Sequence, residues 1–173
     1  LNVSGNLTVG GYGNEVRIGV VSFAVGSTIA VNNLILGGTG TTPAAGAIYM
    51  TNGGTFTVNG DIFVNSVLGN TWTPGTGTLV LANSTTLPAT VFTSFNNLTI
   101  NSGATVTSGR NFSVSGTMNV NGSFIPGATT HVISGSGTIT GTGSIDVTLV
   151  STSALTTQYT ITTKTLANLI VDY

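Results

Sequence analysis

A short unit of the form apolar–x–apolar, followed by Gly or Asn, recurs along the chain and limits its fold more than any other feature. Such a unit is a strand of about three residues with one apolar face, ended by a turn. No stretch of twelve residues has apolar positions at helical spacing. The pattern therefore predicts an all-β chain. Aligned copies occupy residues 3–10, 58–65 and 114–121; a version one residue shorter occupies 31–37, 95–101 and 166–172, and a looser copy 139–148.

The central apolar residue of each copy serves as an anchor for the alignment. Consecutive anchors are 27, 28, 36, 20, 27 and 24 residues apart, a mean of 27. A repeat of this length with one strand–turn–strand corner per copy is typical of a solenoid, whose coils bury their apolar faces only against one another. We predict a right-handed parallel β-solenoid (β-helix) of about six coils, forming a single domain over residues 1–173, because parallel crossovers are nearly always right-handed. The anchors are Leu7, Leu34, Ile62, Leu98, Met118, Ile145 and Leu169.

Stacked coils place equivalent residues about 4.8 Å apart, so like residues should lie on like. We expect Asn side chains at one corner to hydrogen-bond along the stack, and Phe56, Phe92 and Phe112 to stack in the core. The longest gap, between Ile62 and Leu98, is expected to carry an extra strand at residues 79–81. The corner residues are Asn6, Asn33, Asn97 and Asn168, with Asp61 in the same place once.

A Greek-key sandwich of about seven or more strands is the alternative architecture. Its strands are usually longer, about five or six residues. A sandwich also does not need like residues at equivalent places in successive turns of the chain. The repeat therefore favours the solenoid.

The composition excludes several classes of partner. Gly, Thr, Asn and Ser make up 91 of the 173 residues, and charged residues only 4%, against about 25% in ordinary soluble domains. The three basic residues, Arg17, Arg110 and Lys164, are dispersed, whereas nucleic acids and anionic membranes need clustered basic groups. No apolar run exceeds four residues, against roughly 18 for a membrane span. We expect an extracellular or cell-surface protein with no nucleic-acid partner and no membrane insertion.

The chain has few groups that carry chemistry. A glycoside hydrolase needs two carboxylates roughly 5–9.5 Å apart, and a calcium-dependent lyase needs several. We interpret Asp61 as a turn residue, Asp146 as a solvent-facing strand residue and His131, the only histidine, as a turn or strand residue. One histidine and no cysteine exclude a conventional zinc site. We predict a protein that is not an enzyme and has no catalytic residue, cofactor or metal; a polysaccharide lyase or hydrolase is a less favoured alternative. The acids are Glu15, Asp61, Asp146 and Asp172.

Two runs carry a resemblance to known proteins. Residues 95–107 (Phe-Asn-Asn-Leu-Thr-Ile-Asn-Ser-Gly-Ala-Thr-Val-Thr) and 112–122 (Phe-Ser-Val-Ser-Gly-Thr-Met-Asn-Val-Asn-Gly) resemble repeats of very large bacterial surface proteins, especially those of Bacteroidota exported by the type IX pathway. Residues 159–173 resemble the junction at which such arrays pass into their next repeat. The resemblance implies a structural module of an adhesin, filament or surface stalk, and a chain that is a fragment of a longer repeat protein. We expect self-association, end to end or lateral, or continuation in a longer chain.

Two binding functions are alternatives. A glycan-binding adhesin module is one, because Tyr12, Tyr49 and Trp72 fall in predicted loops and aromatic rings stack on sugars. Ice binding is a less favoured alternative. It needs Thr-x-Thr pairs in one register, coil after coil, and the alignment finds only Thr55/Thr57 and Thr138/Thr140 in a shared register. The other Thr-x-Thr pairs are Thr71/Thr73, Thr105/Thr107 and Thr160/Thr162.

Overall fold

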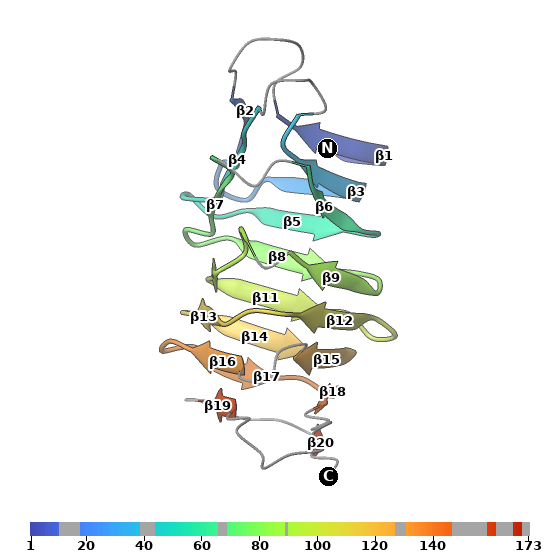
Figure 1. Ribbon diagram of the computed structural model, residues 1–173. Coiled ribbons are helices and arrows are strands. Elements are labelled where there is room, and N and C mark those ends of the chain that lie inside the picture. Colours follow the sequence, from blue (N-terminus) through green and yellow to red (C-terminus); the bar gives the residue numbers. More distant parts are fainter. Residues whose placement is uncertain are drawn as a thin grey trace.

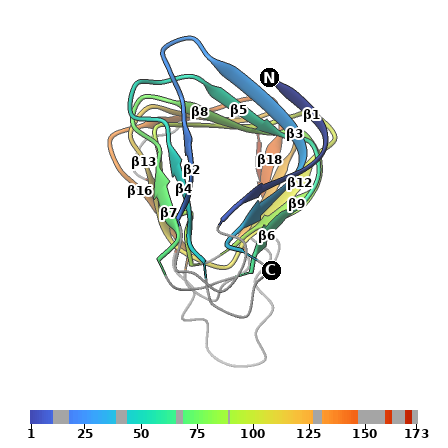
Figure 2. The ribbon, with the colours of Figure 1, turned by 90° about the horizontal axis from the view of Figure 1, so that it is seen from above.

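The computed structural model describes residues 1–10, 18–38, 44–65, 69–88, 90–126, 131–146, 159–161 and 168–170. Every element in these ranges is a β-strand, and every strand pair is parallel. The strands are stacked as coils along one axis (Figure 1). Viewed along that axis, the stack is roughly triangular, with one row of strands on each side (Figure 2). The predicted parallel β-solenoid is confirmed.

The three rows of strands define three faces. Face 1 is formed by β1 (Asn2–Val9), β3 (Thr28–Leu36), β5 (Thr55–Val58), β8 (Thr78–Leu81), β11 (Asn97–Ile100), β14 (Thr117–Val120) and β17 (Thr138–Thr140). Face 2 is formed by β6 (Ile62–Val64), β9 (Thr85–Leu87), β12 (Thr105–Ser108), β15 (Ser123–Pro126), β18 (Ser144–Asp146) and β20 (Asn168–Ile170). Face 3 is formed by β2 (Gly19–Ser22), β4 (Gly46–Tyr49), β7 (Thr71–Thr73), β10 (Ser94–Phe95), β13 (Phe112–Val114), β16 (His131–Ser134) and β19 (Tyr159–Ile161).

Five successive coils in the described part of the chain give one strand to each face: β5–β7, β8–β10, β11–β13, β14–β16 and β17–β19. The first two coils differ, because β1 and β3 continue round the corner from face 1 into face 2, where the end of β3 pairs with β6. The number of coils is therefore close to the predicted six. Seen from the N-terminal end, the descending chain passes clockwise from face 1 to face 2 to face 3, so the solenoid is right-handed (Figure 2).

The core consists of apolar columns that run through the stack. Along β5, β8, β11 and β14 the burial alternates in the same way, half-buried then buried. The inward positions of face 1, all buried except the half-buried Val3 and Ile29, form two ladders in which each residue lies beside its equivalent in the next coil. One ladder is Ile29, Phe56, Leu79, Leu98, Met118 and Ile139; the other is Val3, Val31, Val58, Leu81, Ile100 and Val120. Full burial of such a side chain stabilises the fold by about 1.5–3 kcal/mol, so each further rung of the ladders adds to the stability.

The predicted single column of anchors is wrong. Leu7, Leu34 and Ile62 do form a column, but it lies on face 2. Leu98 lies on face 1, beside Leu79 of the strand expected in the long gap. That strand, β8, is the face-1 strand of a complete coil rather than an extra strand within one. The anchors separate into three short columns: Leu7–Leu34–Ile62, Leu98–Met118 and Ile145–Leu169.

The predicted stack of three phenylalanines is also wrong, although all three side chains are buried. Phe56 lies on face 1 beside Leu79, whereas Phe112 lies on face 3 beside Ile133. Phe92 precedes β10 and belongs to a cluster in which each ring contacts rings of the same or the neighbouring coil. The ring centroids are 5.0 Å apart for Trp72–Phe92, 6.4 Å for Phe92–Phe95, 5.3 Å for Phe95–Phe112 and 5.7 Å for Phe112–Phe124.

Asn side chains at the corners form hydrogen bonds along the stack, and in the first coils this confirms the prediction. The Asn33 Nδ2 donates to Asn6 Oδ1 over 2.9 Å, and the Asn33 Oδ1 accepts the backbone N–H of Asp61 over 2.7 Å. The same arrangement recurs later, where Asn97 Oδ1 accepts the backbone N–H of Thr117 over 2.9 Å. However, Asn33 lies at the corner between faces 1 and 2, and Asn97 at the corner between faces 3 and 1. One local motif is used at two corners.

A glycine in the next coil lies against each of these Asn residues. A Cβ at Gly60 would fall on Asn33 Oδ1, and a Cβ at Gly116 would fall on Asn97 Oδ1 and come within 2.9 Å of the Asn96 carbonyl oxygen. Glycine is thus needed here for close approach of backbone to side chain.

We predict that Gly116→Ala destabilises the protein by about 1–3 kcal/mol, because the new methyl group must displace the Asn97 carboxamide and the coil above. Gly109→Ala, at a corner of the preceding coil, is the control, since a Cβ there meets nothing within 4 Å. Thermal and urea unfolding measure both variants. Equal losses in the two variants would contradict the contact assigned to Gly116.

We also predict that Thr85→Val stabilises the fold by about 1 kcal/mol. Thr85 is inward and only 7% exposed, in one column with Val106, and its Oγ1 has no hydrogen-bond partner among the described residues. Thr86→Val is the control, because Thr86 is exposed and its hydroxyl lies 2.7 Å from that of Thr107. A lower urea midpoint for Thr85→Val than for the unmodified chain would show that the hydroxyl is satisfied.

Candidate functional site

Two of the three aromatic residues predicted to contact glycans lie in strands of face 3, and Tyr12 lies outside the described residues. Tyr49 belongs to β4 and Trp72 to β7, so their expected position in loops is wrong. In the register of these strands Trp72 lies beside the fully buried Ile48, and Tyr49 lies beside Thr73. The two side chains therefore point to opposite sides of the sheet, Trp72 inward and Tyr49 outward.

Trp72 is held by the core. Its indole N–H donates to the Ser94 carbonyl oxygen over 2.7 Å, and its ring centroid lies 5.0 Å from that of Phe92 and 6.1 Å from that of Phe95. The N–H is the single polar group of the side chain. With that group bonded and the ring packed, Trp72 has a structural role in this conformation. Tyr49 is the half-buried, outward-facing aromatic residue that remains of the predicted set.

The structure describes the side chain of one of the five predicted acidic and histidine positions, Asp61. Asp61 lies at a corner, exposed, with its backbone N–H bonded to Asn33, which fits a turn residue. Asp146 lies in β18 and His131 in β16, and only the backbone of these two residues is described; Glu15 and Asp172 lie outside the described residues. Within the ranges that the structure covers, no three His, Asp or Glu side chains are grouped to hold a metal ion. No helix in those ranges has the length and apolar character to cross a membrane.

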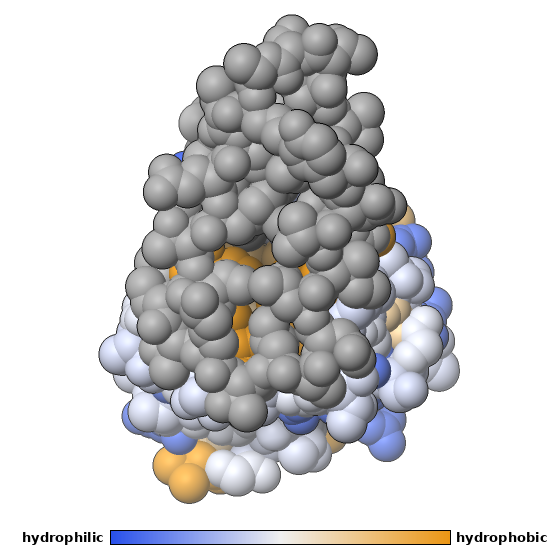
Figure 3. All heavy atoms as spheres, turned by 90° about the horizontal axis from the view of Figure 1, so that it is seen from below, coloured by the Kyte–Doolittle hydropathy of each residue, from blue (hydrophilic) through white to orange (hydrophobic). Residues whose placement is uncertain are grey.

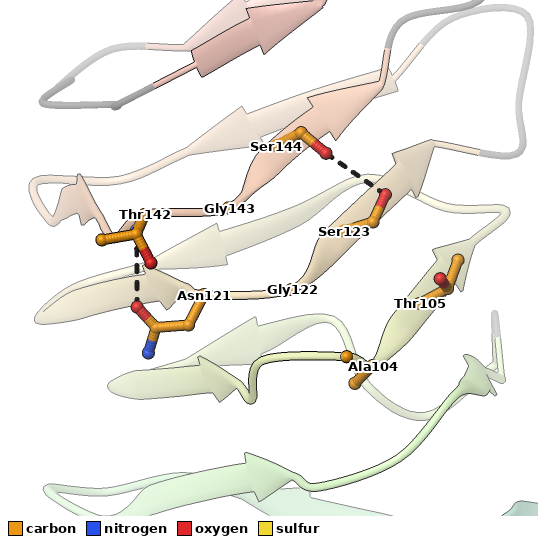
Figure 4. Close-up of a pocket in the computed structure, with 9 residues that line it drawn as sticks. Ala104, Thr105, Asn121, Gly122, Ser123, Thr142, Gly143 and Ser144 are labelled. Atoms are coloured by element: carbon orange, nitrogen blue, oxygen red, sulfur yellow. Dashed lines mark hydrogen bonds between the residues drawn. The ribbon is translucent and has the colours of Figure 1, made fainter.

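A shallow groove of about 350 Å³, which was not predicted from the sequence, lies at the corner between faces 1 and 2. Figure 4 shows three equivalent segments stacked along it. The bonds across it are long: Thr142 N–H to Asn121 Oδ1 is 3.4 Å, and the Ser144 and Ser123 hydroxyls are 3.5 Å apart. The segments are Gly103–Ala104–Thr105, Asn121–Gly122–Ser123 and Thr142–Gly143–Ser144.

The groove exists because the coils need small residues at this corner. A Cβ at Gly122 would collide with backbone carbonyls of the coil above, and one at Gly143 would collide with the Gly122 carbonyl. The lining has hydroxyls, one carboxamide and backbone groups but no charge or imidazole. Such a set can form neutral hydrogen bonds, but it holds no general acid, general base or activated nucleophile. We assign the groove to coil stacking.

The most regular polar surface is the outward side of face 1. It consists of the half-buried positions of β5, β8, β11, β14 and β17, two from each strand. Seven of these ten residues are Thr, and none is charged. The sequence alignment missed this surface because it placed the strands on the wrong faces. The ten residues are Thr55, Thr57, Thr78, Val80, Asn97, Thr99, Thr117, Asn119, Thr138 and Thr140.

Comparison with known proteins gave no relative: no protein-family model, curated protein or solved structure matches the chain significantly.

We predict that Trp72→Phe lowers the stability by about 1–3 kcal/mol, because the Ser94 carbonyl loses its donor in a partly buried place. Tyr49→Phe, on the outward side of the same sheet, should change it by no more than about 0.5 kcal/mol. Urea unfolding followed by circular dichroism serves all three proteins, since Trp72 is the only tryptophan and its fluorescence is lost in the variant. Equal midpoints would show that the indole is not a structural contact.

Proposed function

We propose that this chain is a structural repeat module of an extracellular or cell-surface protein, an adhesin or filament, in which it acts as a rigid stalk and self-association surface. The observation that carries this proposal is the uninterrupted pair of apolar ladders through face 1, from β3 to β14. Each coil is joined to the next by backbone hydrogen bonds and a shared core. Bending the rod would have to break hydrogen bonds between coils and separate their packed side chains, so the coil stack should resist bending.

Further support comes from the chemistry of the surface. In the view from below, most of the described surface is coloured white or blue and little of it orange (Figure 3). The chain has a net charge of only −1. A surface solvated by hydroxyls and amides, with little charge, does not repel a second copy of itself. This composition favours lateral association of rods, and it agrees with the resemblance of residues 95–122 to repeats of bacterial surface proteins.

The first strand offers a site for end-to-end association. In the described part of the chain β1 pairs with β3 alone, so its other edge has no partner strand. An open strand edge presents backbone groups that can pair with a further strand, of the same chain or of a second copy.

A glycan-binding module is the second candidate, and it depends on Tyr49. The outward, half-buried ring of Tyr49 in β4 can stack on a sugar, whereas the Trp72 indole is engaged in the core. A single aromatic ring gives weak affinity for a sugar, so the structural function is the first candidate.

We predict straight rods, or fibres built from them, in negative-stain electron microscopy of the 173-residue chain. The double variant Asn2→Lys/Thr8→Lys should shorten any fibres, because it adds like charges to the open strand β1. Thr107→Lys, in the middle of the stack, is the control. Compact or flexible particles would contradict the stalk function. Short single rods that bind glycans, with binding lost in Tyr49→Ala, would favour the second candidate.

A further inference from the structure

We propose that face 1 is an ice-binding surface, on which columns of Thr and Asn side chains hold water in an ice-like arrangement and so adsorb to a growing ice crystal. The sequence alignment disfavoured this function because it found only two Thr-x-Thr pairs in register. The structure confirms that Thr55/Thr57 and Thr138/Thr140 share a register and places three further coils between them on the same face. The inference is independent of the stalk function.

The outward residues of face 1 form two straight columns. Thr55 lies beside Thr78 and Thr78 beside Asn97, while Thr117 lies beside Thr138. The second column is formed by Thr57, Val80, Thr99, Asn119 and Thr140. Each of the five rungs therefore carries at least one Thr, which lies beside a second Thr, a Val or an Asn.

The columns make a two-dimensional lattice. Neighbouring rungs are about 4.8 Å apart and residues i and i+2 of one strand about 6.6 Å apart. Ice is a rigid lattice of water oxygens, so only a surface with repeated spacings can place several water molecules into it at once. Figure 2 shows that the strands from β5 onward lie one behind another along a nearly straight side of the triangle. Face 1 is thus flat as well as regular.

Threonine is suited to this task because it combines a methyl group with a hydroxyl on a stiff side chain. The methyl restricts the orientation of adjacent water, and the hydroxyl donates and accepts one hydrogen bond or more. In the described part of the chain the side chains of Thr57, Thr99 and Thr140 make no hydrogen bond to protein, so their hydroxyls are available to water. The strands of face 1 from β5 to β17 contain no charged residue, which would impose its own hydration geometry.

The side chain of Asn97 fits the lattice without breaking it. Its Oδ1 accepts the Thr117 backbone N–H over 2.9 Å and its Nδ2 reaches Thr78 Oγ1 over 3.4 Å. The carboxamide is therefore fixed along the column rather than free to project into the solvent.

Face 2 is less suited, although it also carries hydroxyls. The Thr86 and Thr107 hydroxyls bond each other over 2.7 Å, and Ser84 Oγ accepts the Thr105 N–H over 2.9 Å. The internal bond between Thr86 and Thr107 fixes the direction of both hydroxyls and uses part of their capacity to bond water. Ile125 follows Thr107 in the same outward column and interrupts it. This face therefore provides a control on the same molecule.

The test compares Thr99→Tyr at the centre of face 1 with Thr107→Tyr on face 2 of the same coil. Both positions are half-buried and outward-facing in strands of four residues. Ice shaping, the gap between melting and freezing points, and inhibition of ice recrystallisation are measured on the 173-residue chain. The unmodified chain and Thr107→Tyr should be active. Thr99→Tyr should raise the lowest inhibiting concentration about tenfold or more, which corresponds to ~1.4 kcal/mol of adsorption free energy.

Circular dichroism melting shows whether the variants fold. If Thr99→Tyr does not fold, Thr57→Tyr repeats the test at another rung of face 1. The proposal is overturned if the folded, unmodified chain neither shapes ice nor inhibits recrystallisation. It is also overturned if face-1 and face-2 variants lose activity equally. If Thr99→Tyr instead converts a dimer to a monomer in sedimentation, with no effect of the chain on ice, face 1 is a contact between copies.

Discussion

Stacking of each coil on an equivalent coil about 4.8 Å away is the constraint on which the whole structure depends. Each residue of a coil lies beside the equivalent residue of the next coil, so the residues of one column must pack against or bond to one another. Inside, this requirement selects apolar columns such as Val31, Val58 and Leu81. At the corners it selects an Asn that can accept a backbone N–H from the next coil, and a Gly that leaves room for it, as in Asn33 and Gly60.

The same constraint explains why the chain needs so little charge. An ordinary globular domain solvates an irregular surface with charged side chains, but here three rows of parallel strands form the described faces. Thr has a high preference for strands and tolerates a Thr neighbour in the adjacent coil. A column of Lys or Glu would place like charges at one strand spacing, which is destabilising. Outward columns of Thr, with Asn and Val in places, therefore satisfy both the backbone and the solvent.

The sequence was sufficient for the fold class and insufficient for the faces. The short alternating unit predicted parallel coils because a strand of about three residues buries too little alone. It failed to place Leu98, because the Asn-Asn-Leu motif at residues 32–34 turns from face 1 to face 2, whereas the identical motif at 96–98 turns from face 3 to face 1. The local chemistry of the two corners is the same, so the amino-acid sequence of the motif does not show at which corner it turns. The inward direction of Trp72 was missed for a related reason. Its neighbour Ile48 is set by the register of β4 and β7, which the sequence does not show.

Because the alignment assigned the strands to the wrong faces, it also missed the regular outer surface of face 1. What the described part of the fold offers is repetition of weak contacts at fixed intervals. Each hydroxyl of face 1 contributes little alone, but the ladder beneath it already fixes its position, so a second and third contact add affinity with little further loss of entropy. The proposed rigidity and the proposed surface binding would both follow from one feature, because the in-register core that joins the coils also holds the Thr columns in line. A ligand that matches these columns must itself be periodic.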